Sequence, residues 1–287
     1  MFIVINPTWR CNLASEIGKC PYCPNLVSDN GHRVEFYWGL GENKVGFEAT
    51  ARQWLDFLPR LGSGIVDICG GEPLCWDGLQ EFIEGLPKGF EWYITSNCLQ
   101  PEIIKKLDLS RCRMWTASFH PYAMGKGDYG NRFFRSLRVL VKRHLPVVVS
   151  IMAYPENIHW LPFWAEAFAG WAFTVNVQPY EDPRYDWREH PDKLEGLMAV
   201  KQYENELKLP YWDSEPSSKM CAAGKDYLMT APDGTVYRCN MALITGAKPL
   251  GSIFDSGDFI LKEAALCEIP CSSSCDRERR EGGKDLA

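Results

Sequence analysis

Three cysteines lie close together near the start of the chain, in the stretch PTWRCNLASEIGKCPYCPN. Cys11, Cys20 and Cys23 come directly after the apolar run FIVIN at residues 2–6. Structural zinc usually takes four protein ligands, whereas an iron–sulfur cluster held by three thiolates leaves one iron open to an outside ligand. The triplet therefore fits a cluster that binds a small molecule, and zinc or ordinary buried thiols are the alternatives on spacing alone.

Composition limits the class of protein. The chain has 287 residues, 46% of them hydrophobic, and a formal net charge of -6. This predicts a folded protein and disfavours nucleic acid as a partner. MFIVINP has neither a charged leader nor a cleavage-site pattern, and the longest apolar runs are too short to span a membrane, so we expect a cytoplasmic protein. In a reducing compartment, twelve cysteines suggest metal ligands rather than disulfides.

Strand-like and helix-like patterns alternate along the first part of the chain. Strands are predicted at residues 2–6, 64–69, 91–97, 113–120, 146–154 and 173–180, with five helical segments between them. This alternation predicts an α/β fold with a parallel sheet whose strands end on one side, where loops can build a site. The sequence GGEP (residues 70–73) follows the second of these strands. Its glycines allow a ligand to approach the backbone, and Glu72 can accept a hydrogen bond from an amino group.

The cysteine triplet and GGEP together resemble the radical S-adenosylmethionine (radical SAM) superfamily. The resemblance covers residues 2–180 and implies a partial (β/α)6 TIM-type barrel. Tyr22 fits the family's preference for an aromatic residue before the third cysteine. The first gap differs, because the commonest family spacing has three residues there and this chain has the eight residues NLASEIGK.

The resemblance also implies roles for individual residues. Cys11, Cys20 and Cys23 would hold a 4Fe-4S cluster, and S-adenosylmethionine (SAM) would bind its open iron. Gly70, Gly71 and Glu72 would contact the amino end of SAM, while Tyr22 would pack near its adenine. Further residues at or near strand ends would reach SAM or substrate, or would simply tie down loops: Asn97, Ser118, His120, Ser150 and Gln178. An electron from a donor such as flavodoxin or ferredoxin would cleave SAM to a 5'-deoxyadenosyl radical, which abstracts a hydrogen from the substrate.

The C-terminal part contains five more cysteines. A helical linker is expected at residues 181–218 and a separate module at 219–287, which resembles the SPASM and shorter twitch modules that carry auxiliary clusters. A hairpin around PDG brings Cys221 and Cys239 together. With Cys271 and Cys275 they would hold a second 4Fe-4S cluster, leaving Cys267 as a packed thiol. A zinc ribbon is the alternative for this module.

The sequence says less about the substrate. Oxidation of a small molecule is the main expectation, because no leader-peptide-binding domain precedes FIVIN. Radical modification of a peptide or protein side chain, such as a thioether or carbon–carbon crosslink or an epimerisation, is the alternative. A non-catalytic metal-binding scaffold is a third, remote interpretation. Cys98, at the end of a strand, is a candidate hydrogen donor or radical relay.

Overall fold

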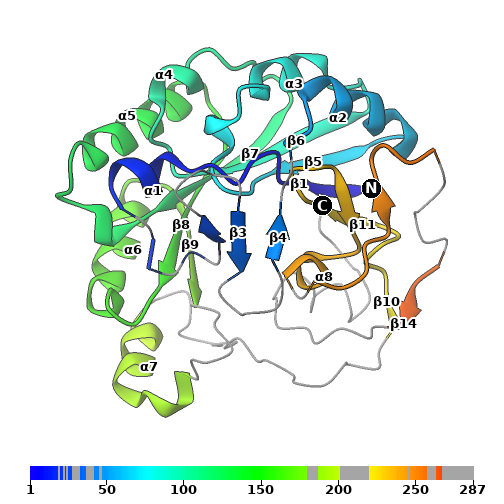
Figure 1. Cartoon of the computed structure of the whole chain (residues 1–287). Coiled ribbons are helices and arrows are strands. Elements are labelled where there is room, and N and C mark those ends of the chain that lie inside the picture. Colours follow the sequence, from blue (N-terminus) through cyan, green and yellow to red (C-terminus); the bar gives the residue numbers. More distant parts are fainter. Residues whose placement is uncertain are drawn as a thin grey trace. The chain divides into compact units, whose positions relative to one another are not determined.

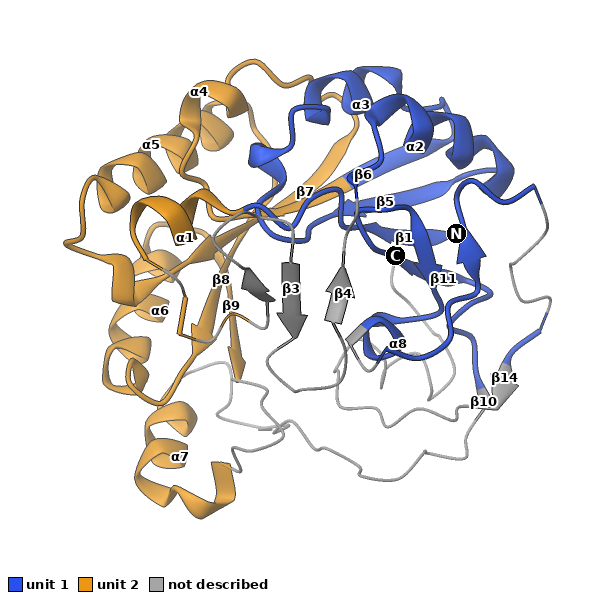
Figure 2. Cartoon of the chain, in the orientation of Figure 1, with its two compact units in different colours: residues 1–10, 24–92, 211–287 blue, residues 11–23, 93–210 orange. Residues whose placement is uncertain are grey.

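The computed structural model describes residues 1–18, 20–21, 23, 25–27, 33–36, 42–44, 47–179, 187–200, 220–244, 246–256 and 263–266. The chain forms two compact units, which Figure 2 shows in different colours. Unit 1 comprises residues 1–10, 24–92 and 211–287, and unit 2 comprises residues 11–23 and 93–210. The predicted domain limits at residues 180 and 219 stay a prediction.

Strands and helices alternate along much of the chain (Figure 1). The strands are β1 (Phe2–Ile5), β2 (Asn25–Val27), β3 (Arg33–Phe36), β4 (Glu42–Lys44), β5 (Gly64–Ile68), β6 (Phe90–Ser96), β7 (Cys112–Phe119), β8 (Val147–Ala153), β9 (Thr174–Pro179), β10 (Met220–Cys221), β11 (Tyr227–Thr230), β12 (Thr235–Tyr237), β13 (Gly251–Ser252) and β14 (Ala265–Leu266). The α-helices are α1 (Asn12–Glu16), α2 (Ala51–Phe57), α3 (Leu79–Gly85), α4 (Pro101–Ile104), α5 (Tyr129–Lys142), α6 (Leu161–Gly170), α7 (Pro191–Met198) and α8 (Asn240–Ile244).

The main sheet has the strand order β13-β12-β11-β1-β5-β6-β7-β8-β9. Strand β1 pairs in parallel with β5, β7 with β8, and β8 with β9. The six strands predicted in the first part of the sequence correspond to β1 and β5–β9. The expected α/β fold with a mostly parallel sheet, as in a partial (β/α)6 TIM-type barrel, is confirmed.

In unit 1, β1 lies between β5 and β11, and it is parallel to both. The predicted hairpin around PDG is present, with β11 antiparallel to β12. Asn6, directly after β1, fastens the hairpin: its Nδ2 donates to the carbonyl oxygen of Thr230 at 2.6 Å, and its Oδ1 accepts from the Cys69 thiol at 3.3 Å. The C-terminal hairpin thus continues the sheet that β1 begins, which the sequence did not indicate.

Two smaller sheets in unit 1 were not expected from the sequence. Strands β2, β3 and β4 form an antiparallel sheet between the cysteine loop and α2 in the chain. Strands β10 and β14 pair antiparallel, which places Cys221 opposite Ala265. Helix α2 begins at a capping box in which the side chains of Thr50 and Gln53 bond to each other's backbone N–H groups, so its start is encoded locally.

Unit 2 contains the end of β6 together with β7, β8 and β9, and α5 and α6 pack on β7 (Figure 1). Phe119 at the end of β7 is the centre of an aromatic cluster. Its ring centroid lies 5.2 Å from that of Phe133 on α5 and 4.7 Å from that of Trp164 on α6. Some tryptophans are not core residues: Trp160 and Trp171 are more than half exposed. In the described part of the chain, no helix combines the length and apolar character needed to cross a membrane.

Candidate cofactor and substrate site

The cysteine loop of unit 2 is built around a short helix. Cys11 is the N-cap of α1, and Gly18, in the left-handed region at φ 117°, reverses the chain after it. The N–H of Cys23 donates to the carbonyl oxygen of Cys20 at 3.1 Å. Because a helix advances only about 1.5 Å per residue, α1 absorbs five of the eight residues between Cys11 and Cys20 without separating the two thiols by an extended chain. The unusual first gap therefore has a structural explanation.

The sulfur of Cys20 has two polar neighbours in the loop after β7. The hydroxyl oxygen of Tyr122 lies 3.3 Å from it and His120 Nδ1 lies 3.7 Å from it. Burial raises the pKa of the Cys20 thiol to about 12, the Tyr122 hydrogen bond opposes this, and the nearby charges of Cys23 and Cys11 add to it. None of the three cysteines forms a disulfide with another described cysteine. Burial also lowers the pKa of His120 to about 4, so this ring is neutral at physiological pH.

Asn97, which follows β6, connects the next strand end to the same loop. Its Nδ2 donates to Asn12 Oδ1 at 2.9 Å and lies 3.8 Å from the sulfur of Cys11, while its Oδ1 accepts from the N–H of Leu99 at 3.0 Å. Asn97 is only 4% exposed. The geometry supports the loop-fastening role that the sequence left open for this residue, and it puts an amide N–H beside one predicted cluster ligand.

Ser118 and Ser150 are neighbours in the sheet of unit 2. Ser118 on β7 is in register with Ser150 on β8, which is in register with Asn176 on β9. Phe119 packs against helices on one face, so Ser118, its neighbour in β7, points to the other face. The three residues form a polar row on that face. Gln178 lies two residues after Asn176 on the same strand and is exposed.

In unit 1, the GGEP turn packs against the chain itself. The N–H of Gly71 donates to the carbonyl oxygen of Thr8 at 2.9 Å. The N–H of Glu72 donates to the carbonyl oxygen of Arg10 at 2.8 Å. A Cβ atom on Gly71 would collide with the carbonyl oxygens of Trp9 and Arg10. These glycines therefore allow close approach of residues 8–10. A ligand contact at Gly70 and Gly71 stays a prediction.

Glu72 itself is 1% exposed, and its Oε1 accepts from the N–H of Leu74 at 3.1 Å. The side chain therefore caps the short 3-10 helix Pro73–Cys75. A buried carboxylate fixed by a backbone N–H is held in one orientation. Its expected role, accepting from the SAM amino group, is a prediction that the structure of unit 1 does not test.

Two predicted ligands of the auxiliary cluster lie in unit 1. Cys221 ends β10, Cys239 follows β12, and both are buried in one hydrophobic cluster that also contains Trp9 and Tyr227. The N–H of Ala242 lies 3.4 Å from the sulfur of Cys239. Both cysteines therefore belong to one hydrophobic core cluster, and their role as ligands of an auxiliary iron–sulfur cluster stays a prediction.

Some predicted site residues lie outside the described part of the chain: Tyr22, Cys271 and Cys275, together with Cys267, the alternative ligand. Cys98 is described. It is fully buried and has φ 60°, and its carbonyl oxygen accepts from Ser136 Oγ at 2.6 Å. Within the described residues, no three His, Cys, Asp or Glu side chains are arranged to hold a single metal ion.

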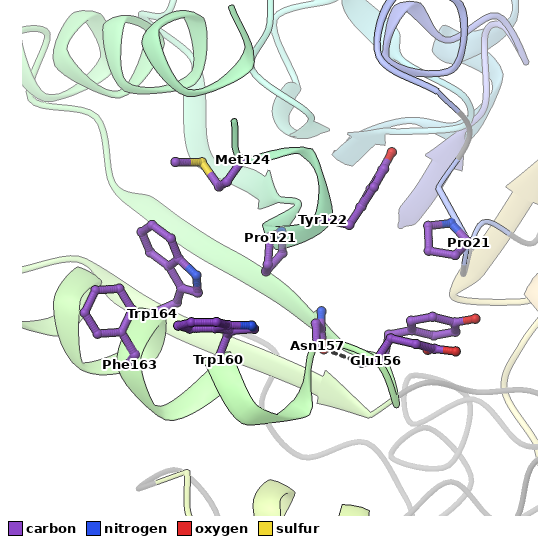
Figure 3. Close-up of a pocket in the computed structure, with 10 residues that line it drawn as sticks. Pro21, Pro121, Tyr122, Met124, Glu156, Asn157, Trp160, Phe163 and Trp164 are labelled. Carbon is purple, nitrogen blue, oxygen red and sulfur yellow. Dashed lines mark hydrogen bonds between the residues drawn. The ribbon is translucent and has the colours of Figure 1, made fainter. Parts of the chain in front are cut away.

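A cavity of about 500 Å³ opens beside the cysteine loop of unit 2 (Figure 3). Pro21, which follows Cys20, forms one part of its wall, and the loops after β7 and β8 and the start of α6 form the rest. The lining residues are Pro21, Pro121, Tyr122, Met124, Tyr154, Glu156, Asn157, Trp160, Phe163 and Trp164. Tyr122 therefore touches both a predicted cluster ligand and the cavity.

The donor set of unit 2 fits an iron–sulfur cluster. Three thiols belong to one loop, and O–H and N–H groups lie beside two of them. Asn12 Nδ2, one residue after Cys11, is buried and has no acceptor among the described residues. Cluster sulfurs and thiolates are acceptors of such hydrogen bonds, which tune the reduction potential.

Sequence reasoning missed three polar residues of this region: Asn12, Tyr122 and Asn176. Asn176 could have been found by aligning the ends of the predicted strands, because TVNVQPY places it two residues before Gln178 on the same face. Tyr122 follows SFHP directly, yet nothing in its spacing shows that its hydroxyl reaches back to Cys20. That contact joins residues 102 positions apart and depends on the fold.

Solved structures share this fold. A structure described as anSMEcpe with bound AdoMet (S-adenosylmethionine) matches with a TM-score of 0.62 at 14% identity, covering 98% of this chain and 79% of that one. The structure of SuiB of Streptococcus suis bound to precursor peptide SuiA matches with a TM-score of 0.59 at 14% identity, covering 88% of this chain and 62% of that one. A structure of anSMEcpe with bound AdoMet and Kp18Cys peptide matches with a TM-score of 0.61 at 13% identity, covering 91% of this chain and 80% of that one. No protein-family model matches the chain. At this identity the likeness shows a shared fold and no more.

Proposed function

We propose that the chain is a radical SAM enzyme that modifies a side chain of a peptide or protein. The observation that carries this proposal is the surrounding of Cys20. Cys20 belongs to a three-cysteine loop, its sulfur has polar contacts with Tyr122 and His120, and Tyr122 and the neighbouring Pro21 line a cavity large enough for a side chain.

The chain's own residues would bind and orient the cofactors. Cys11, Cys20 and Cys23 would hold a 4Fe-4S cluster, which supplies the electron that cleaves bound SAM to methionine and a 5'-deoxyadenosyl radical. Asn97 keeps Cys11 and the end of β6 together. The polar row Ser118, Ser150 and Asn176 would offer hydrogen bonds to SAM or substrate from β7, β8 and β9. Gln178 and Glu72 are further candidates, on β9 and in the GGEP turn.

The peptide reading replaces the small-molecule oxidation expected from the sequence. Two of the structures that share the fold were solved with peptides, namely SuiA and Kp18Cys peptide. An electron donor such as flavodoxin or ferredoxin is part of the same proposal.

A second 4Fe-4S cluster in the C-terminal module is part of the same proposal. Cys221 and Cys239 belong to one buried hydrophobic cluster of unit 1, and the backbone N–H of Ala242 lies near the Cys239 sulfur. Buried thiols with such a donor nearby suit a cluster, since the apolar surroundings exclude water. Cys271 and Cys275 would complete the ligand set.

The substrate class can be tested by mass spectrometry. Anaerobically reconstituted protein, SAM and a reductant are incubated in parallel with carbon-deuterated small molecules and with carbon-deuterated peptides encoded near the gene. The masses of the products and of deoxyadenosine are then measured. We expect a mass change confined to a peptide, with deuterium transfer to deoxyadenosine. Loss of two hydrogens from a small molecule, with every peptide unchanged, would restore the oxidoreductase reading.

A further inference from the structure

Hydrogen bonds fix the loop after β8, which forms part of the wall of the cavity beside the cysteine loop. Asn157, at its base, is 6% exposed and fixes the loop after β8: its Nδ2 donates to the carbonyl oxygen of Met152 and its Oδ1 accepts from the N–H of Tyr154, both at 2.9 Å. The N–H of Trp160 donates to the carbonyl oxygen of Asn157 at 2.9 Å. The two residues that flank Asn157 in the cavity wall, Glu156 and Trp160, therefore stand on an ordered turn (Figure 3).

Aromatic rings make up much of the wall. Trp164 is held against Phe119 at 4.7 Å and against Phe163 at 5.1 Å between ring centroids. Trp160 and Phe163 are nevertheless 62% and 58% exposed. Large aromatic side chains so exposed beside a cavity mark a binding surface.

The charge of the wall is acidic. Among the ten residues that line the cavity, Glu156 is the one Asp, Glu, Lys, Arg or His. One ring of the wall already contacts a cation of the chain itself: Lys126 Nζ lies 4.9 Å from the centroid of the Tyr122 ring. A side chain with a long apolar stem and a positive end matches rings and a carboxylate together.

We propose that this cavity binds a lysine or arginine side chain of the substrate peptide. The aliphatic stem packs on Trp160 and Phe163, and the charged end lies beside Glu156. This inference rests on the proposed peptide-modifying function and adds the substrate's side-chain class to it. Because Pro21 and Tyr122 connect the cavity to Cys20, the basic residue would anchor the peptide beside the predicted cluster.

Three blocked pentapeptides, Ala-Ala-Xaa-Ala-Ala with Xaa as lysine, norleucine or glutamate, provide the probes. Norleucine keeps the aliphatic stem and lacks the charge. Calorimetric titration into the reconstituted, SAM-loaded protein measures their dissociation constants. We expect lysine to bind about fivefold more tightly than norleucine, and glutamate most weakly.

Glu156→Gln should reduce the preference for lysine over norleucine to about one while leaving norleucine binding unchanged. Glu166→Gln is the matched control, because Glu166 is exposed on α6 and does not line the cavity. Trp160→Leu should weaken lysine and norleucine by similar factors, since the ring packs on the aliphatic stem that both probes share. Trp171→Leu, a similarly exposed tryptophan outside the cavity, is its control.

Equal binding of lysine and norleucine by the wild type, or equal effects of Glu156→Gln and Glu166→Gln, would overturn the inference. Deoxyadenosine formation is measured in the same samples. If deoxyadenosine forms but the lysine preference is absent, the cavity assignment fails alone. If the Glu156-dependent preference is present but no deoxyadenosine forms, the proposed function fails and the binding site stands.

Discussion

The hydroxyl oxygen of Tyr122 lies 3.3 Å from the sulfur of Cys20 and 2.9 Å from the carbonyl oxygen of Gly18. The hydroxyl has one proton, so it can donate to only one of these acceptors at a time. A thiolate is the stronger acceptor because it is charged. In the cluster-loaded protein we therefore expect Tyr122 to donate to Cys20.

Replacing Tyr122 by phenylalanine should make the reduction potential of the first cluster more negative. A donated hydrogen bond stabilises the more negatively charged reduced cluster, and its net worth of about 1 kcal/mol corresponds to a shift on the order of 40 mV for one electron. Potentiometric titration followed by electron paramagnetic resonance measures it. Tyr154→Phe, which removes a hydroxyl from the same cavity wall, should leave the potential unchanged. Equal shifts in both variants would refute a direct Tyr122–Cys20 contact.

Asn97→Ala should both destabilise the fold and weaken retention of the first cluster. The change removes buried hydrogen bonds to Asn12 and Leu99, which is worth about 1–3 kcal/mol of unfolding free energy. It also frees the loop that carries Cys11. Chemical unfolding and iron release to a chelator measure the two effects.

Ser136→Ala is the matched control for Asn97→Ala. Ser136 is fully buried and its hydroxyl donates to the carbonyl oxygen of Cys98, which is not a predicted cluster ligand. We expect a loss of about 1 kcal/mol in unfolding free energy with normal iron retention. Faster iron release from Ser136→Ala as well would mean that retention follows global stability and not the Asn97 contacts.

Gly71→Ala should destabilise unit 1, because the added Cβ would meet the backbone carbonyls of Trp9 and Arg10. A backbone clash cannot be relieved by a side-chain rotation, so we expect a cost of about 1–3 kcal/mol. Gly170→Ala is the control: its Cβ would meet no atom within 4 Å. That variant should be as stable as the wild type or slightly more so. Thermal unfolding compares them, and equal melting temperatures for Gly71→Ala and the wild type would contradict the packing of the GGEP turn.

The sequence predicted the alternating strands and helices of the main sheet better than the small β2–β4 sheet and the pairing of the C-terminal hairpin with β1. Apolar runs such as GIVDIC and the periodic stretch NRFFRSLRVLVKRH indicate β5 and α5 because burial imposes their periods. Strands β2, β3 and β4 have three or four residues each, too few to show a period. The parallel pairing of β11 with β1 joins positions more than 220 residues apart, which local patterns do not reveal.

The candidate site likewise has features that the sequence predicts and features that depend on the fold. Cysteine spacing predicts that three thiols share a loop, since ligand type and local chain length are visible in sequence. The Asn97–Cys11 and Tyr122–Cys20 contacts, the polar row through Asn176 and the aromatic cavity with Glu156 depend on strand register and loop packing. They became visible only in three dimensions.

The ligands of the auxiliary cluster can be assigned by iron content. Cys239→Ala, Cys271→Ala and Cys275→Ala should each lose about four of about eight irons and keep the first cluster. Cys267→Ala should keep all of them. The register of β10 with β14 makes this variant the informative one, because Ala265, two residues before Cys267, pairs with Cys221. Loss of auxiliary iron from Cys267→Ala with retention in Cys271→Ala or Cys275→Ala would reassign the ligand set.

The central claim is that Cys11, Cys20 and Cys23 hold the cluster that cleaves SAM. The most direct measurement is the yield of 5'-deoxyadenosine from anaerobically reconstituted protein with SAM and a reductant, for the wild type and for the variant with all three cysteines replaced by alanine. We predict that the wild type forms 5'-deoxyadenosine and that the triple variant forms none while keeping about four irons in the auxiliary module. Stoichiometric zinc without sulfide in the wild type, or undiminished 5'-deoxyadenosine from the triple variant, would contradict the claim.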